Sequence, residues 1–124
     1  MTKKEKQRQS VYEKYGGHCA YCGEHIEYKD MQVDHVNAKR NGGIDSIENY
    51  NPSCRLCNHY KRASSLETFR NELLAHVVDR LMNVYIFRVA LKYGMIEIKE
   101  WDRKFYFEKI NNKEQMKLQE KQGD

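Results

Sequence analysis

Four cysteines in two CxxC pairs constrain the fold of this chain more than any other feature. Cys19 and Cys22 form the first pair, and Cys54 and Cys57 form the second. Where no export signal precedes them, such pairs indicate metal binding more often than disulfides. Four thiolates complete a tetrahedral zinc site that leaves no coordination position open for a substrate. We therefore expect one structural Zn²⁺ that joins two distant segments.

The segment between the two pairs is longer than a compact zinc ribbon needs. Residues 23–53 separate them, whereas a ribbon usually has roughly 15–20 residues in that place. The alternative is that the thiols are free or redox-active, which would need only one pair and predicts no bound zinc. The zinc interpretation implies that a substantial structure is inserted between the pairs.

Composition indicates one small soluble domain. The chain has 124 residues, 40% of them hydrophobic and 32% charged, which is typical of a globular protein. The formal net charge of +4 is compatible with a nucleic acid partner and equally with plain solubility. There is no apolar run of about 18 residues and no apolar signal segment at the N-terminus. We expect a cytoplasmic protein with no membrane contact.

The N-terminal half is predicted to contain both helix and strand. Residues 3–15 lack Gly and Pro and are followed by Gly16 and Gly17, which predicts a helix and its end. Residues 31–36 alternate as a strand does. Ser46 is a candidate cap for a short helix at 47–50, which Pro52 would close.

The C-terminal half is predicted to be helical first and extended later. Apolar residues recur at spacings of three and four from Leu66 onward, which predicts one long helix or two up to Lys92. The period-two stretches MIEIKE and KFYFEKI predict a β-hairpin within residues 95–110. Residues 111–124 have few apolar anchors and are expected to form a polar surface tail.

The motif that carries chemistry runs from Cys19 to Lys61. The pattern CxYCG…VDHVxxxxxGG…ENYxxxCxxCNxxK resembles the HNH endonucleases. The resemblance covers about a third of the chain and implies an α+β fold: a ββα-metal finger braced by a four-cysteine zinc site, with flanking helices. We therefore predict a single nuclease domain at 1–110, with the finger and zinc site at 17–62 and a helical extension at 65–93.

The resemblance also assigns roles to four polar side chains. His35 takes the position of the general base, and histidine is suited to deprotonating water near neutral pH. Asp34 and Asn58 take the metal-ligand positions, and two hard oxygens favour Mg²⁺ or Mn²⁺. Asn49 takes the position of the asparagine that holds the ββ loop so that the imidazole is aimed. The family pattern places the third motif residue directly after CxxC, which favours Asn58 over His59.

Five basic or histidine side chains near the motif are candidate phosphate contacts, although ordinary surface charge is the alternative. They are Lys61, Arg62, Lys39, Arg40 and His59. Asp34 and His35 are adjacent, and adjacent strand residues face opposite sides, so they can serve one site only if the strand ends or bends there.

Together these features predict a metal-dependent HNH endonuclease that hydrolyses DNA. One site cuts one strand, so a monomer should nick, and a homodimer would be needed for a double-strand break. The alternative is a zinc-braced nucleic-acid-binding module without catalytic activity. Free-standing HNH proteins of this size resemble those of phages, restriction systems and mobile elements.

Overall fold

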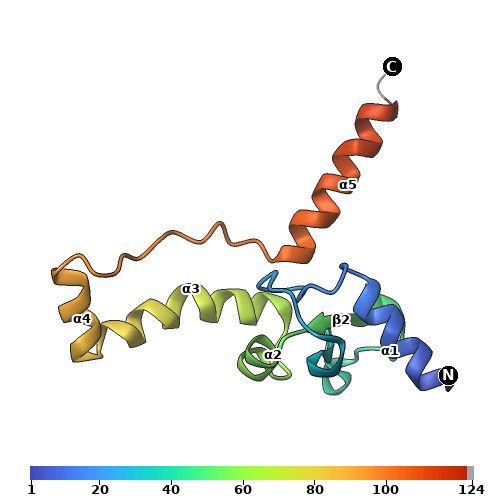
Figure 1. Ribbon diagram of the computed structural model, residues 1–124, viewed down its shortest axis with the longest axis horizontal. Helices are drawn as coiled ribbons and strands as arrows, with labels where there is room; N and C mark the ends of the chain where they lie inside the picture. Colours follow the sequence, from blue (N-terminus) through green and yellow to red (C-terminus); the bar gives the residue numbers. More distant parts are fainter. Residues whose placement is uncertain (123–124) are drawn as a thin grey trace. The chain divides into compact units, whose positions relative to one another are not determined.

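A computed structural model describes residues 1–122 (Figure 1). The chain divides into two compact units. The first comprises Met1–Ser65 together with the segment from Lys104 onward, and the second is Leu66–Arg103. The first unit holds all four cysteines and every predicted site residue. Among the helices described, none combines the length and the apolar character that a membrane span requires.

A two-stranded antiparallel sheet forms the centre of the first unit. β1 (Gln32–His35) pairs with β2 (Tyr50–Ser53), and α2 (Arg55–Lys61) follows β2 directly and packs on β1. This ββα order confirms the predicted α+β fold. Sequence reasoning missed β2, because Pro52 suggested the end of a helix. Pro52 is tolerated here because a two-stranded sheet consists only of edge strands, and its carbonyl accepts the N–H of Ala20 (2.8 Å).

The first helix supports the sheet from one side. α1 (Lys3–Glu13) begins at Thr2, whose Oγ1 accepts the N–H of Glu5 (3.1 Å) as an N-cap. Its Val11 side chain is completely buried. Just after the helix, the Lys14 ammonium donates to the carbonyl of Tyr50 (2.7 Å), the first residue of β2. These contacts fix α1 against the sheet.

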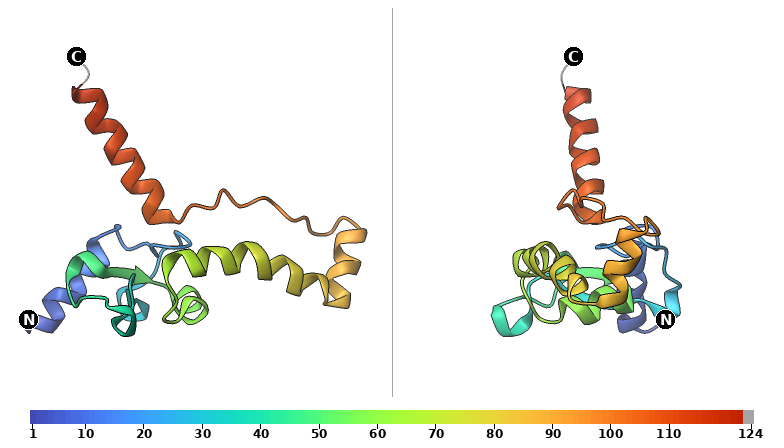
Figure 2. Two further views of the ribbon diagram at one scale, coloured as in Figure 1. Left: turned by 180° about the vertical axis from the view of Figure 1, so that it is seen from behind. Right: turned by 90° about the vertical axis from the view of Figure 1, so that its left-hand side faces the viewer.

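The second unit contains two helices. α3 (Leu66–Met82) and α4 (Tyr85–Lys92) are separate and run in different directions (Figure 2). The apolar periodicity did not decide between one long helix and two, and the structure has two. Tyr85 and Ile86 in the first turn of α4 are 73% and 72% exposed.

The predicted hairpin at 95–110 is wrong. Residues 95–104 contain no strand, and α5 (Tyr106–Gln122) begins directly afterwards. The alternating aromatic residues are anchors and not strand residues. The Phe105 ring is almost fully buried and lies edge-on to Tyr21 (centroids 5.3 Å apart), and its N–H donates to Glu108 Oε1 (2.9 Å), which caps the helix start.

The predicted polar tail at 111–124 is helical over the part described. It continues α5 to Gln122, with exposed side chains over residues 111–119. Positions 123 and 124 lie outside the described residues. The helix start is held by the first cysteine segment, because the N–H groups of Tyr106 and Phe107 donate to the carbonyls of Tyr21 and Ala20 (3.1 and 2.8 Å).

Candidate metal centre and nuclease site

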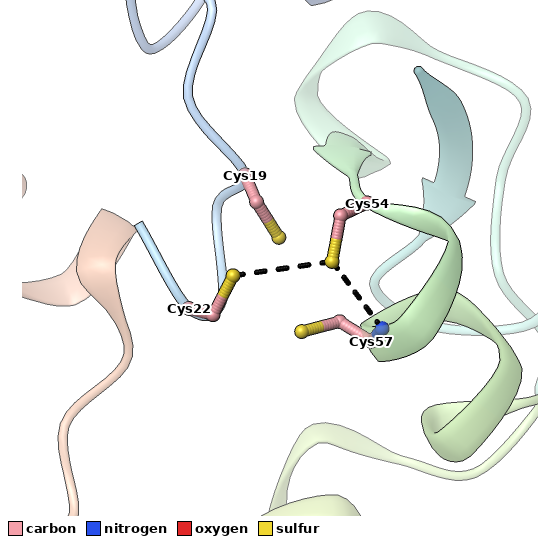
Figure 3. A group of neighbouring side chains, drawn as sticks. All are labelled: Cys19, Cys22, Cys54 and Cys57. Atoms are coloured by element: carbon pink, nitrogen blue, oxygen red, sulfur yellow. Dashed lines mark hydrogen bonds between the residues drawn. The ribbon is translucent and has the colours of Figure 1, made fainter. Parts of the chain in front are cut away.

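The four cysteine sulfurs converge on one point. All four Sγ atoms lie within 4.8 Å of one another, and Cys22 Sγ lies 3.9 Å from Cys54 Sγ (Figure 3). A tetrahedral zinc with Zn–S bonds of about 2.3 Å separates its sulfurs by about 3.8 Å. The spacing and the donor type therefore fit one structural Zn²⁺, as predicted.

Each pair is shaped by its own backbone. Cys54 is the N-cap of α2, and its Sγ accepts the N–H of Cys57 (3.4 Å). After the first pair, Gly23 turns with φ +81°, and a Cβ there would lie 2.9 Å from the Tyr106 ring. A hydrogen bond from Cys57 is the main reason that the pKa of Cys19 falls to about 4. The same contact raises the pKa of Cys57, because the donor of that hydrogen bond is favoured in its neutral form.

Asp34 is buried between Tyr21 and Lys61. The Tyr21 hydroxyl donates to Oδ2 (2.5 Å), and the Lys61 ammonium lies 3.1 Å from Oδ2 and 3.4 Å from Oδ1. Burial raises the pKa of Asp34, and the two donors oppose that rise. This carboxylate is therefore balanced by a cation that belongs to the chain itself.

Lys61 lies in the interior and not on the surface. Its side chain is 0% exposed, and its ammonium also donates to the carbonyl of His35 (3.2 Å). Sequence reasoning predicted a phosphate contact here, but in this position the ammonium contacts Asp34 and the β1 backbone. A buried ion pair of this kind needs several hydrogen bonds to offset desolvation.

His35 lies at the end of β1 and faces away from Asp34. The strand register is regular, with Asp34 opposite Asn51 and His35 opposite Tyr50, so no bulge brings the two side chains to one face. The His35 side chain is 30% exposed, and its Nε2 lies 2.9 Å from Asp45 Oδ1. Because the strand ends at His35, the imidazole and the carboxylate of Asp34 flank the same strand terminus.

Asp45 is a site residue that sequence reasoning missed. It contacts Lys39 (2.7 Å) as well as His35, and these two partners, Lys39 first, lower its pKa. No motif position marks it, because it reaches His35 only when the loop folds back.

Asn49 ties together the loop between the strands. Its Oδ1 accepts the N–H of Asn37, and its Nδ2 donates to the carbonyls of Asn37 and Ile44, all at 2.9 Å. Gly43 must be glycine, because a Cβ there would lie 1.7 Å from the Asn37 carbonyl oxygen. These contacts are those expected of a loop-holding asparagine, while its effect on the aim of His35 stays a prediction.

Asn58 is half-buried on α2. It precedes Lys61 by three residues, so both lie on one helix face, and the Lys61 contact with Asp34 shows that this face is turned toward β1.

His59 is exposed. Arg62 is also exposed and stands beyond the end of α2 with φ 55°, so it does not share the helix face of Asn58. Arg40 is exposed in the loop beside Lys39.

Asp34 and Asn58 were predicted to bind a second cation, and this stays a prediction; both side chains carry hard oxygen donors. An ionised carboxylate has about four lone-pair sites, and the protein donors near Asp34 are Tyr21 and Lys61. This type of donor suits a small hard cation. Lys61 already balances the charge of the Asp34 carboxylate, however, so it competes with such a cation. We therefore expect this cation to bind weakly.

Comparison with known families identifies the motif segment. Residues 19–64 match the model of the HNH endonuclease family. The segment is an HNH domain. It contains β1, β2, α2 and all four cysteines, and the match confirms the resemblance given by the motif.

A solved structure has a similar fold. The HNH-containing chain is similar to a Type II-C Cas9 enzyme from Actinomyces naeslundii, with a TM-score of 0.53 and 24% sequence identity. The match covers 59% of this chain and only 8% of the Cas9 chain, so the likeness concerns the fold of one part of that enzyme. A comparison with curated protein sequences found no match.

Proposed function

We propose that this HNH domain hydrolyses phosphodiester bonds in DNA, with His35 as the general base. The observation that carries the proposal is the half-exposed imidazole of His35 at the end of β1, held by Asp45 and adjacent to a buried carboxylate. A histidine oriented by a carboxylate is suited to accepting a proton from water.

The contact with Asp45 assigns the two ring nitrogens of His35. When Nε2–H donates to Asp45 Oδ1 (2.9 Å), Nδ1 carries the free lone pair and accepts the proton of the attacking water. The Asp45 carboxylate then stabilises the imidazolium that forms. Asn49 holds the loop backbone next to this pair, and that role supports a fixed imidazole position.

A divalent cation on Asp34 and Asn58, Mg²⁺ or Mn²⁺, would stabilise charge on the phosphate and on the departing 3′ oxygen. Lys61 orients Asp34 and also binds the carbonyl of His35, so it couples the two residues of the motif. It therefore acts as a positioning residue. One such site cuts one strand, so the monomer nicks duplex DNA and a homodimer would be needed for a double-strand break.

The Lys61–Asp34 pair also favours a second candidate function. A carboxylate already neutralised by an internal ammonium needs no metal, and this is compatible with a zinc-braced module that binds nucleic acid without cutting it. This module would bind DNA equally well with and without Mg²⁺.

A plasmid nicking assay separates the two functions. Zinc-loaded protein is incubated with supercoiled DNA and Mg²⁺ or Mn²⁺, and the conversion to open circles is measured. We expect metal-dependent nicking that His35→Ala lowers by about 10²–10⁴-fold. His76→Ala, an exposed histidine in the second unit, is the matched control and should nick at the wild-type rate. DNA binding without nicking in any metal would reject the nuclease and favour the binding module.

A further inference from the structure

A cavity lies beside His35, on the side of the sheet that α1 covers. Its volume is about 240 Å³. Helix α1 contributes Lys4, Gln7, Arg8 and Val11, and β1 contributes Val33 and His35. Val33 and His35 alternate with Asp34 along the strand, so the cavity opens on the face opposite the Lys61–Asp34 pair.

The lining divides into an apolar floor and a cationic rim. Val33 from β1 and Tyr50 from β2, which is 8% exposed, form the floor, and the fully buried Val11 supports it from below. Lys4 is exposed at the rim and Arg8 is half-buried. No acidic side chain lines the cavity within the described part of the chain. An apolar floor with a cationic rim suits a ligand that has both a flat apolar ring and an anionic group.

Arg8 is held in place by bonds that do not involve a ligand. Its Nη2 donates to the carbonyls of Tyr28 (2.9 Å) and Met31 (2.8 Å), and its guanidinium lies over the Tyr28 ring (5.1 Å to the centroid). A guanidinium fixed in this way is pre-organised, so an incoming anion does not have to order it.

We propose that this cavity binds one nucleotide of the DNA strand next to the phosphate attacked by the water that His35 activates. Lys4 and Arg8 contact the backbone phosphate of that nucleotide, and the floor of Val33 and Tyr50 contacts its base or sugar. The inference rests on the proposed nuclease function, because His35 belongs both to the cavity and to the reaction. It adds α1, which lies outside the matched segment 19–64, to the DNA-binding surface.

The test compares two lysines on the same helix. Lys4 lines the cavity and Lys6 does not, and both are exposed. Lys4→Gln and Lys6→Gln remove the same charge. Fluorescence anisotropy with labelled single-stranded and duplex DNA, in zinc-loaded protein without added Mg²⁺ or Mn²⁺, gives the Kd and its salt dependence.

We expect Lys4→Gln to weaken binding by about three- to tenfold and to lower the slope of log K against log salt by about 0.7–0.9, the value for one phosphate contact. Lys6→Gln should change the Kd less than about twofold. Equal losses in the two variants would overturn the cavity as a binding site.

A second readout tests for the base. A single abasic position is moved through a cleaved oligonucleotide, and cleavage should slow by about tenfold at one position next to the cut. Equal cleavage rates at every position would overturn the nucleotide assignment. If the protein never nicks DNA but Lys4→Gln weakens DNA binding more than Lys6→Gln does, the nuclease function is rejected and the cavity is retained as a binding site. If the protein nicks DNA and the Lys4→Gln and Lys6→Gln variants bind DNA equally well, the cavity is rejected and the nuclease function is retained.

Discussion

The zinc cluster and the end of β1 are both built from pairs of distant segments, but they differ in how complete they are. The four sulfurs lie within 4.8 Å of one another, so a cation can join them without rearrangement. At the end of β1, Asp34 is bound by Tyr21 and Lys61, and His35 faces the other side of the strand. The sulfurs of the first site are already spaced for a cation, whereas the polar side chains of the second site are held by contacts within the chain.

The difference arises from the chemistry of the ligands. Four thiolates in one place repel each other unless a cation neutralises them, so their convergence favours metal binding. A buried carboxylate can be neutralised by a lysine of the same chain. The internal partner orients Asp34 and opposes the rise in its pKa that burial causes.

The largest effect is expected from loss of the zinc site. Cys57→Ser, or a strong chelator, should abolish cooperative unfolding of the first unit. Zinc binding contributes about 10–16 kcal/mol in small zinc domains, as much as the whole stability of a typical domain, about 5–15 kcal/mol. Circular dichroism and elemental analysis measure folding and zinc content.

The control for that experiment is His25→Ala, an exposed residue beside the first cysteine pair. It should retain one zinc per chain and the wild-type melting temperature. A Cys57→Ser protein that still folds and binds zinc would contradict the closed four-sulfur site, whereas wild-type protein that folds without zinc would favour the alternative of free thiols.

A smaller effect is expected from the buried pair at the end of β1. Lys61→Met leaves Asp34 buried without its cation and should destabilise the protein by about 3–5 kcal/mol. The double variant with Asp34→Asn should recover most of the loss, because no unpaired charge remains. Urea denaturation measures both variants.

The matched control is Lys39→Met, which breaks the exposed contact with Asp45 (2.7 Å). Its effect on the free energy of unfolding should be far smaller, because solvent screens an exposed pair. If Lys61→Met and Lys39→Met lower the free energy of unfolding by the same amount, Asp34 and Lys61 do not form a buried ion pair.

A catalytic effect with only a small stability effect is expected at Asp45, because its contact with Lys39 is exposed to solvent. Asp45→Asn keeps the shape of the side chain but cannot stabilise an imidazolium, so single-turnover nicking should slow by about tenfold, less than in His35→Ala. The midpoint of urea unfolding should stay near the wild-type value. Nicking at an unchanged rate would remove Asp45 from the mechanism.

The smallest effect concerns the pH dependence of stability. The pKa of Asp45 is lowered from its ordinary value of 3.8, mainly by Lys39 and then by His35. A lowered folded-state pKa contributes stability that is present above the unfolded value and is lost as the pH falls through the folded value. The stability difference between wild type and Asp45→Asn should therefore be present at neutral pH and shrink below about pH 3.8. A difference that grows toward acid would contradict the assigned contacts.

Sequence reasoning reached the parts of the molecule that depend on short-range patterns. The CxxC spacing led to the four-sulfur cluster, and the motif from Cys19 to Lys61 led to the family and to the ββα order. It failed where distant residues meet. Lys61 was predicted to contact phosphate, and its buried contact with Asp34 was not anticipated. KFYFEKI was expected to be a strand, although its aromatic rings pack on Tyr21.

By itself, the sequence was enough to predict the four-cysteine cluster, the HNH resemblance and a candidate general base, because CxxC pairs and motif spacing involve residues close together in the chain. Only the tertiary structure decided which side chains neutralise Asp34, which carboxylate orients His35, and where α1 leaves a cavity. The physical reason is that burial and charge pairing depend on contacts such as that of Lys61 with Asp34, which lie far apart in the chain and leave no periodic signal.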